Sequence, residues 1–192
     1  RRKISEEAYD FIHRCCGSYE AQKADAIYRF VQEGLRMGRA VMSHLTAPYM
    51  QTLFAIERNF TNESHFFIEI LRFEELENGT LFGRINPKSE VLPYLADHFA
   101  DRFAGEQWVI ADTVHRTVLL HKANYKTVYL SMDEVDMDEL TLTYSEDEKQ
   151  LQKLWKLFVD TIAIKERVNP KLQRQMLPLR FRKYMKEFSE SE

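Results

Sequence analysis

Three polar residues near the middle of the chain have types and a spacing that suit acid–base chemistry on a phosphate ester. His98 and Arg102 stand four residues apart in a segment with helical periodicity, so they share one helix face. Asp112 ends the apolar stretch QWVIAD, which predicts a strand. A histidine, an arginine and a carboxylate can together move a proton and bind a phosphate oxygen. We therefore take His98, Arg102 and Asp112 as candidate catalytic residues for an enzyme acting on nucleic acid or a nucleotide.

A structural role fits the same residues. In that interpretation His98 is half-buried under the predicted sheet, and Arg102 forms an ion pair with Asp112. The sequence contains no glycine-rich phosphate loop, no G-x-S-x-G nucleophile elbow and no H-E-x-x-H zinc motif. Enzymatic activity is therefore left open by the sequence, and we expect no cofactor.

The residue types that commonly bind metals do not form a known motif. Cys15 and Cys16 are the only cysteines and are adjacent, so a Cys-rich zinc site is excluded and we expect two reduced thiols. Residues 133–148 hold eight acids and no Lys or Arg, but the stretch DEVDMDEL lacks the glycine and the spacing of a calcium loop. We expect a solvated acidic loop there and no metal site.

The end of the chain is strongly basic, although the whole protein has a formal net charge of -3. Residues 165–186, the basic segment, carry eight Lys and Arg and one acid, a charge of +7, whereas residues 1–164 carry -7. Cations on a helix can lie along a nucleic-acid backbone, because each neutralised phosphate releases counterions. We predict phosphate contacts from the cations and hydrogen bonds from the two amides in the set Arg167, Asn169, Lys171, Gln173, Arg174, Arg180, Arg182 and Lys183.

The basic segment also fits roles that involve no nucleic acid. Lys and Arg are common on exposed helices near a C-terminus, because they complement the helix dipole. The segment can also dock on the acidic residues 133–148 of the same chain, or on an acidic protein partner. A membrane surface is disfavoured, because two prolines interrupt the segment and its apolar face is short.

Hydrophobic periodicity indicates helices at both ends of the chain. The expected helices cover residues 5–16 and 20–37, an element that begins at Pro48, residues 91–104, and a long element after Ser145. Ser145 and Glu148 form a capping box ahead of an apolar stripe. Pro170, directly after Asn169, is typical of the first position of a further helix.

Strands are expected in the middle of the chain. Asn78-Gly79 lies between two apolar runs and signals a hairpin with a type I′ turn, so residues 67–76 and 80–86 should pair antiparallel. The stretches QWVIAD, TVLLH and KTVYLS predict three more strands. The predicted fold class is therefore α+β, with a central antiparallel sheet of about five strands flanked by N-terminal and C-terminal helices.

A chain of 192 residues, 44% hydrophobic and 30% charged, fits one globular domain. The expected parts are a helical part (1–62), the sheet with its inserted helix (63–131), the acidic loop (132–145) and C-terminal helices (146–188). The sequence has no run of about 18 apolar residues and no signal peptide, so we expect a cytoplasmic protein with no membrane contact. The chain begins at Arg1 without Met, so we expect it to be part of a longer protein. Its oligomeric state is not predicted.

Three stretches of the chain form a joint pattern: RFEELENGTLFGRINPKSEVLPYLADHFADRF, QWVIAD and IAIKERVNPKLQRQMLPLRFRKYM. His65 and Phe67, just before the first stretch, belong to the same pattern. The positions that carry it within the stretches are Arg72, Phe73, Ile85, Pro87, Leu92, Pro93, His98, Phe99, Arg102, Phe103, Trp108, Ile110, Asp112, Ile164, Arg167, Asn169, Pro170, Leu172, Gln173, Arg174, Pro178, Arg180 and Phe181. This pattern resembles that of a bacterial family of DNA metabolism and DNA repair proteins. The family is classified as a domain of unknown function. Met185 departs from it, since the family often has an aromatic residue there.

The resemblance covers nearly the whole chain and implies nucleic-acid binding, with DNA as the polymer. Members of the family are often encoded beside a radical-SAM protein, and some are fused to a uracil-DNA-glycosylase-like domain, so proteins of these two kinds are the implied partners. The resemblance supplies no catalytic residue. We expect an accessory protein of DNA metabolism or DNA repair that binds nucleic acid through the basic segment. The alternatives are an enzyme that uses His98, Arg102 and Asp112, and a protein-interaction module without nucleic-acid contact.

Overall fold

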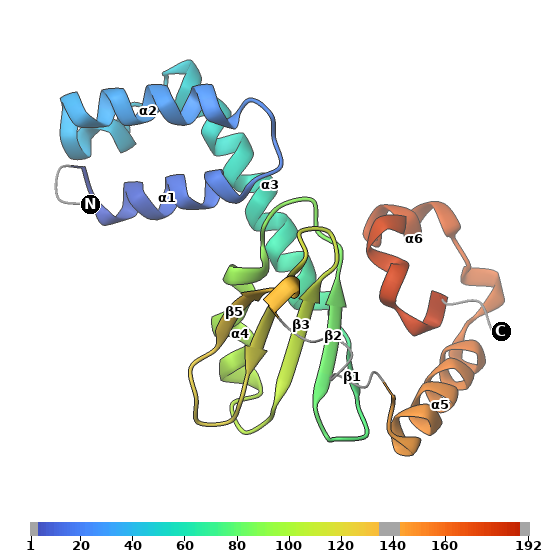
Figure 1. Cartoon of the computed structure of the whole chain (residues 1–192). Helices are drawn as coiled ribbons and strands as arrows, with labels where there is room; N and C mark the ends of the chain where they lie inside the picture. Colours follow the sequence, from blue (N-terminus) through green and yellow to red (C-terminus); the bar gives the residue numbers. More distant parts are fainter. Residues whose placement is uncertain (1–3, 135–142, 189–192) are drawn as a thin grey trace. The chain divides into compact units, whose positions relative to one another are not determined.

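The computed structural model describes residues 4–134 and 143–188 of the chain (Figure 1). The chain divides into two compact units. One unit combines Arg1–Glu69 with Pro87–Leu95, and the other combines Ile70–Asn86 with Ala96–Glu192. Helices and a five-stranded sheet make an α+β fold, as the sequence predicts.

The first unit is helical. Its main elements are α1 (Glu6–Gly17), α2 (Lys23–Met37), the 3-10 helix η1 (Gly38–Ser43) and α3 (Pro48–Ile70). Ser5 caps α1 by accepting a hydrogen bond from the N–H of Ala8 at 3.1 Å, and Gly38 ends α2 with a φ of 63°. The three N-terminal helices predicted from the sequence are confirmed. Their apolar faces form one core, which includes Phe11, Phe30, Met50, Leu53 and Ile56.

The third helix extends further than the sequence suggests. Residues 67–70 are expected in a strand, and this expectation is wrong because α3 continues to Ile70. The buried positions of α3 recur every three or four residues as far as Phe67, so the helical period outlasts the local β propensity of the stretch HFFIEI.

The second unit contains the sheet. Its strands are β1 (Phe73–Glu75), β2 (Leu81–Ile85), β3 (Trp108–Asp112), β4 (Thr117–His121) and β5 (Val128–Ser131), side by side in chain order. The expectation of an entirely antiparallel sheet is wrong, because β2 and β3 pair in parallel. The connection between them passes through α4 (Leu92–Arg102), and such a crossover returns the chain to the end where β2 began.

The hairpin at Asn78-Gly79 is confirmed, with a different turn. Strands β1 and β2 pair antiparallel, and the N–H of Gly79 donates to the carbonyl of Leu76 at 2.8 Å. Gly79 has a φ of 77°, but Asn78 does not have a positive φ, so the expected type I′ turn is wrong. The side chain of Asn78 instead accepts a hydrogen bond from the N–H of Thr80 at 3.0 Å, which stabilises the turn locally.

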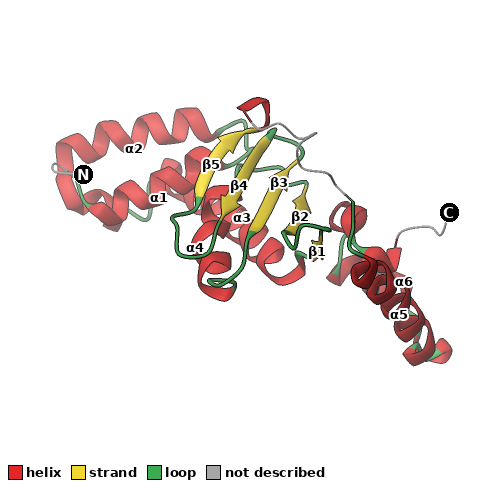
Figure 2. Ribbon diagram, turned by 60° about the horizontal axis from the view of Figure 1, so that its bottom comes forward, coloured by secondary structure: helices red, strands yellow, loops and turns green. Residues whose placement is uncertain are grey.

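The two faces of the sheet carry different apolar side chains, and Figure 2 shows α4 against one of these faces. On one face, Phe99 of α4 packs against Phe73 and Trp108, with ring centroids 5.3 and 6.4 Å apart. On the other face, Phe82 and Val118 form a second core cluster, against which Tyr144 packs. All five residues of the central strand β3 are buried, so the middle of the sheet is closed to solvent.

The C-terminal elements follow the sheet in the second unit. They are α5 (Glu146–Ile162), η3 (Lys165–Arg167), α6 (Pro170–Met176), η4 (Leu179–Tyr184) and η5 (Lys186–Phe188). The cap predicted at Ser145 is confirmed, since its side chain accepts from the N–H of Glu148 at 3.0 Å, but the N–H of Ser145 donates to the carbonyl of Glu75, so the return bond of the capping box is not formed. Pro170 opens α6 as predicted, and the side chain of Asn169 caps this helix by accepting from the N–H of Leu172 at 3.1 Å. No helix within residues 4–134 and 143–188 has the length and apolarity needed to cross a membrane.

Candidate nucleic-acid interface

Asp112 is committed to the turn between β3 and β4. Its side chain is buried, and its Oδ1 accepts hydrogen bonds from the N–H groups of Val114 and His115 at 2.9 and 3.1 Å. Its Oδ2 lies 2.7 Å from Nδ1 of His115. The turn then passes through Arg116, which has a φ of 55°, so the carboxylate holds a backbone conformation that a non-glycine residue seldom adopts.

The other two catalytic candidates lie on α4. His98 is half-buried, its ring meets that of Phe99 edge-on, and its Nε2 has no hydrogen-bond partner among the described residues. Arg102 is exposed and lies over the ring of Phe103. In the part of the chain that the structure describes, no hydrogen bond or ion pair joins either residue to Asp112, so their joint catalytic role stays a prediction.

The basic segment ends in a stretch that is anchored on the sheet. Phe181 and Met185 are buried, each with 7% of its surface exposed. The side-chain amide of Asn86, just after β2, donates to the carbonyl of Arg180 at 2.9 Å, and the hydroxyl of Thr113, just after β3, lies 3.0 Å from the hydroxyl of Tyr184. These contacts fix η4 at the ends of two neighbouring strands.

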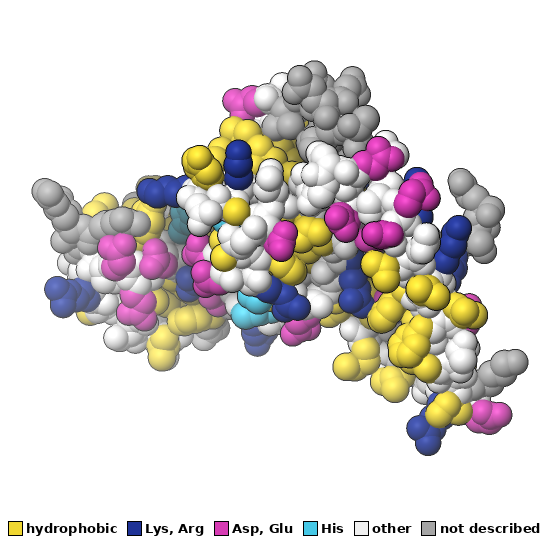
Figure 3. Space-filling model, turned by 90° about the horizontal axis from the view of Figure 1, so that it is seen from below, with side chains coloured by type: hydrophobic (Ala, Val, Ile, Leu, Met, Phe, Trp, Pro, Cys, Tyr) yellow, Lys and Arg dark blue, Asp and Glu magenta, His cyan; other side chains and the backbone are white. Residues whose placement is uncertain are grey.

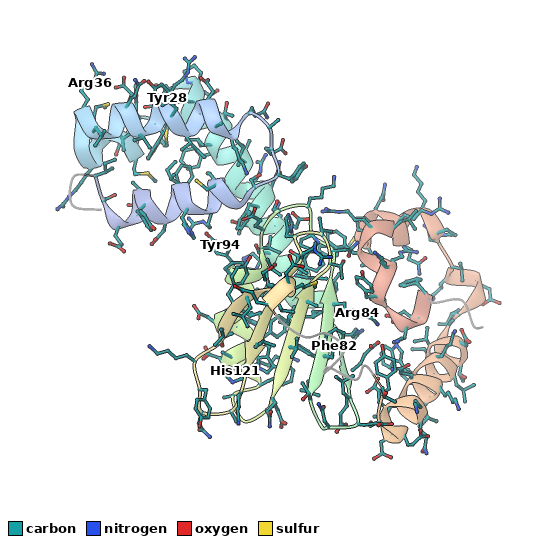
Figure 4. The ribbon with its side chains drawn as sticks, viewed as in Figure 1. Tyr28, Arg36, Phe82, Arg84, Tyr94 and His121 are labelled. Carbon is teal, nitrogen blue, oxygen red and sulfur yellow. The ribbon has the colours of Figure 1, made fainter. Side chains whose placement is uncertain are left out.

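A buried carboxylate strengthens this anchor. Nζ of Lys186 lies 2.7 Å from Glu74 of β1, and the guanidinium of Arg84, which extends from β2, lies 3.4 Å from the same carboxylate (Figure 4). Arg84 also donates to the hydroxyl of Tyr144 at 3.0 Å. Burial, together with the hydrogen bond to Glu74, raises the pKa of Tyr144 to about 12, so its phenol stays neutral at physiological pH. Lys186 therefore serves the anchor.

Three of the eight predicted contact residues make hydrogen bonds within the basic segment. Asn169 caps α6 through its side-chain oxygen. Arg182 is half-buried, donates to the carbonyl of Leu177 at 3.0 Å and reaches the side-chain oxygen of Gln173 at 3.4 Å. These three side chains hold the shape of the segment, and any contact they make with a ligand is additional to that role.

The other five predicted contact residues are exposed cations: Arg167, Lys171, Arg174, Arg180 and Lys183. Arg180 and Lys183 lie over the rings of Phe181 and Tyr184, with their charged groups 4.2 and 5.0 Å from the ring centroids. Arg167, Lys171 and Arg174 form no ion pair with any residue in the described ranges. The fold therefore presents these three charges to solvent instead of neutralising them.

The expected docking of the basic segment on residues 133–148 is tested only in part. Residues 135–142 lie outside the described residues. Of the rest, Asp133 pairs with Arg116 at 2.7 Å and Glu146 with Lys149 at 2.6 Å. Glu148 accepts hydrogen bonds from the N–H of Glu75 and from the amide of Gln152. These acids are thus engaged by residues outside the basic segment.

The family model described as a domain of unknown function (DUF4130) matches residues 21–187. The chain belongs to the DUF4130 family. No curated protein and no solved structure matches it. The matched range begins just before α2 and ends within η5, so it includes every catalytic and nucleic-acid-binding candidate of this DUF4130 chain.

A second group of cations lies on α5, and the sequence prediction missed it. Lys149, Lys153 and Lys156 share one face of α5 and line a shallow hollow of about 260 Å³ together with Gln152 and Lys186. The spacing of four and three residues between these lysines was the available signal. The charge count over residues 165–186 does not reach α5, and over residues 146–156 three acids offset the three lysines.

The opposite face of α5 in this DUF4130 chain is apolar and exposed. Its large side chains, all of them solvent-accessible, are Leu151, Leu154, Trp155, Leu157, Phe158 and Ile162. Figure 3 shows hydrophobic side chains gathered over this helix. The helix itself was predicted correctly, but its apolar stripe is not part of a buried core. In soluble proteins, large exposed apolar patches are commonly found at interaction sites.

A small apolar hollow of about 140 Å³ adjoins this face. It lies where α5 meets β1 and η5, and its lining includes Phe73, Leu151, Gln152 and Trp155. The guanidinium of Arg72 lies 5.3 Å from the centroid of the Trp155 ring. The hollow therefore combines an aromatic wall with charged groups, because its lining also includes Arg72, Lys186 and the carboxylates Glu74, Glu148 and Glu187.

A third hollow, of about 690 Å³, lies in the first unit between α2 and the start of α3. It is lined by Tyr28, Arg36 and other polar residues (Figure 4). Its arginines are matched by acids, since Arg29 pairs with Asp25 at 3.0 Å and Arg36 with Glu33 at 2.6 Å. No group of three His, Cys, Asp or Glu side chains within the described ranges is placed to hold a metal ion.

Proposed function

We propose that this DUF4130 protein is an accessory protein of DNA metabolism or DNA repair that binds nucleic acid through its basic segment. The observation that carries the proposal is the exposure of Arg167, Lys171 and Arg174 without an ion pair to any described residue. A protein with a net charge of -3 that keeps unpaired cations together on one short segment has a local site for polyanions.

The anchor of the basic segment supports the proposal. The burial of Phe181 and Met185 and the ion pair of Lys186 with Glu74 fix the end of the segment on the sheet. Cations on an anchored backbone lose less conformational freedom on binding than cations on a free tail. Arg180 and Lys183 lie in this anchored stretch, and Arg182 of the same stretch reaches Gln173 of α6 at 3.4 Å.

The resemblance of the three motifs to a family of DNA metabolism and DNA repair proteins supports DNA as the polymer. It also supports a radical-SAM or uracil-DNA-glycosylase-like protein as the partner that acts on the bound DNA. In this proposal the DUF4130 protein holds the nucleic acid, and the partner supplies the chemistry.

The test is an anisotropy titration of labelled duplex DNA at several salt concentrations. If the five exposed cations each neutralise one phosphate, the logarithm of the association constant should fall with the logarithm of salt with a slope of about -4.5. The triple variant Arg167→Ala, Lys171→Ala, Arg174→Ala should reduce the magnitude of this slope by about 2.7.

A matched control removes three exposed cations elsewhere, as in the triple variant Arg39→Ala, Arg58→Ala, Lys126→Ala. It has the same net charge as the test variant and should keep the original slope. Equal slopes for the two triple variants would contradict binding through the basic segment.

Protein binding without nucleic acid is the second candidate function. The exposed apolar face of α5 favours it. The same titration separates the two candidates, because a pure protein-interaction module should bind neither duplex nor single-stranded DNA at low salt.

A further inference from the structure

We propose that α5 carries a binding site for single-stranded nucleic acid, in which an unstacked base packs against Trp155 and the adjoining phosphate lies in the lysine hollow. The inference deepens the proposed function and rests on it for the class of polymer. It assigns a substrate form, the single strand, and a set of residues outside the basic segment.

The aromatic side chains of α5 are available to a base. Trp155 is 39% exposed and Phe158 is 51% exposed, and their ring centroids lie 5.9 Å apart. Trp155 also forms a wall of the 140 Å³ hollow, whose lining includes Phe73. This volume is well below the roughly 300–1,000 Å³ typical of sites for drug-sized ligands, so it suits one planar ring system.

The lysine hollow has the charge that a phosphate needs. Its lining consists of Lys149, Lys153, Lys156, Lys186 and the uncharged Gln152. Lys149 pairs with Glu146 and Lys186 pairs with Glu74, and neither acid is part of the lining. Every charged group of the lining is an ammonium group, and such groups can donate to phosphate oxygens from several directions.

The two hollows adjoin, because Gln152 and Lys186 line both of them. Around the axis of α5, Gln152 lies between Trp155 and Lys156, so the aromatic wall and the lysine face are neighbours. The amide nitrogen of Gln152 donates to Glu148 at 2.7 Å, which leaves its oxygen as an acceptor at the boundary. A base N–H group can donate to this oxygen while the phosphate of the same nucleotide contacts the lysines.

The arrangement selects a single strand. In a duplex the faces of the bases are stacked on one another and are closed to a protein ring. Aromatic side chains beside a cationic groove are the usual means of binding single strands without sequence preference. A duplex can use the lysines and the basic segment but cannot use Trp155.

The test combines two readouts on the full chain. Trp155 and Trp108 are the only tryptophans, and Trp108 is fully buried, so quenching by a ligand reports on Trp155. The probes are a short oligothymidylate, an abasic strand of equal length and a duplex. We expect oligothymidylate to quench the fluorescence, and the abasic strand and the duplex to leave it unchanged.

Labelled strands give the affinity. Trp155→Ala should weaken binding of oligothymidylate about tenfold and should leave the abasic strand unaffected. The double variant Lys153→Ala, Lys156→Ala should weaken the binding of oligothymidylate and of the abasic strand by the same factor. Leu157→Ala, which removes another exposed apolar side chain of α5, is the matched control and should change neither.

The outcomes distinguish this site from the proposed function. If DNA binds with a salt-dependent affinity but Trp155→Ala has the same effect on both strands, or none, the base site is overturned and binding by the basic segment stands. If none of the three probes binds at low salt, the proposed function fails and the base site fails with it.

Discussion

At the scale of single residues, Asp112 shows how a candidate catalytic group can be explained by structure. Its two oxygens accept from two backbone N–H groups and contact one imidazole nitrogen within three residues of the chain. A buried carboxylate with these partners stabilises the turn that contains Arg116. Nothing in the sequence alone separates this role from catalysis, because both roles place an acid at the end of a strand.

Replacing this carboxylate should destabilise the fold. Asp112→Ala leaves the N–H groups of Val114 and His115 without their partner, and a buried donor left unsatisfied costs about 1–3 kcal/mol. We expect the free energy of unfolding, measured by urea titration, to fall by about 2 kcal/mol. The exposed Asp101 serves as the control, and Asp101→Ala should change stability by less than about 0.5 kcal/mol. If Asp112→Ala unfolds with the same free energy as the original protein, the carboxylate does not stabilise the turn, and Asp112 becomes a stronger catalytic candidate.

At the scale of elements, the sequence predicts best where a local rule is sufficient. Ser5 and Ser145 cap helices at the positions that their side chains predict, Pro170 begins α6, and Asn78-Gly79 forms a hairpin. The sequence fails where two local signals conflict or where a distant partner decides. The stretch HFFIEI has strand propensity but continues the helical period of α3, and the parallel pairing of β2 with β3 depends on the direction in which the crossover returns.

The candidate site also has features that the local sequence predicts and features that depend on distant residues. Charge segregation identifies the basic segment, and exposure of Arg167, Lys171 and Arg174 agrees with it. The anchor between Lys186 and Glu74 could not be foreseen, because it joins residues more than a hundred positions apart. The exposure of the apolar stripe of α5 could not be predicted either. Periodicity predicts that a helix has an apolar face, but it does not show whether another element covers that face.

The cap of α6 gives a prediction at this scale. Asn169 is a predicted nucleic-acid contact, and the structure uses it to cap the helix that carries Lys171 and Arg174. Asn169→Ala should loosen the first turn of α6, at a cost of about 1 kcal/mol, and weaken DNA binding several-fold. Asn169→Ser keeps a capping oxygen and should restore most of the affinity in the same anisotropy assay. If the serine variant binds as weakly as the alanine variant, the amide itself contacts the ligand.

At the scale of the whole molecule, both units contain a tyrosine whose ionisation is opposed by the fold. Burial raises the pKa of Tyr94 in the first unit and of Tyr144 in the second, each to about 12 from a usual value near 10. Tyr94 contacts His13, and Tyr144 lies among Glu74 and Arg84. In both units the neutral phenol is the form that the native structure holds.

This shared feature predicts how the protein unfolds in alkali. Because the folded pKa is raised, each native phenol retains a proton that the unfolded chain has already lost between pH 10 and pH 12. The stabilisation is complete below about pH 10 and is lost as the pH rises towards 12. Urea unfolding followed by circular dichroism should therefore show stability falling across this window.

Single replacements separate the two contributions. Tyr144→Phe removes the phenol that titrates in the second unit. The free energy of unfolding should then decrease less between pH 10 and pH 12, and the remaining decrease should come from Tyr94. Tyr94→Phe should do the converse, and the double variant should have the flattest profile of all. An alkaline loss that is unchanged in the double variant would place its origin elsewhere, with the buried thiol of Cys15, whose pKa burial also raises to about 12, as the next group to replace.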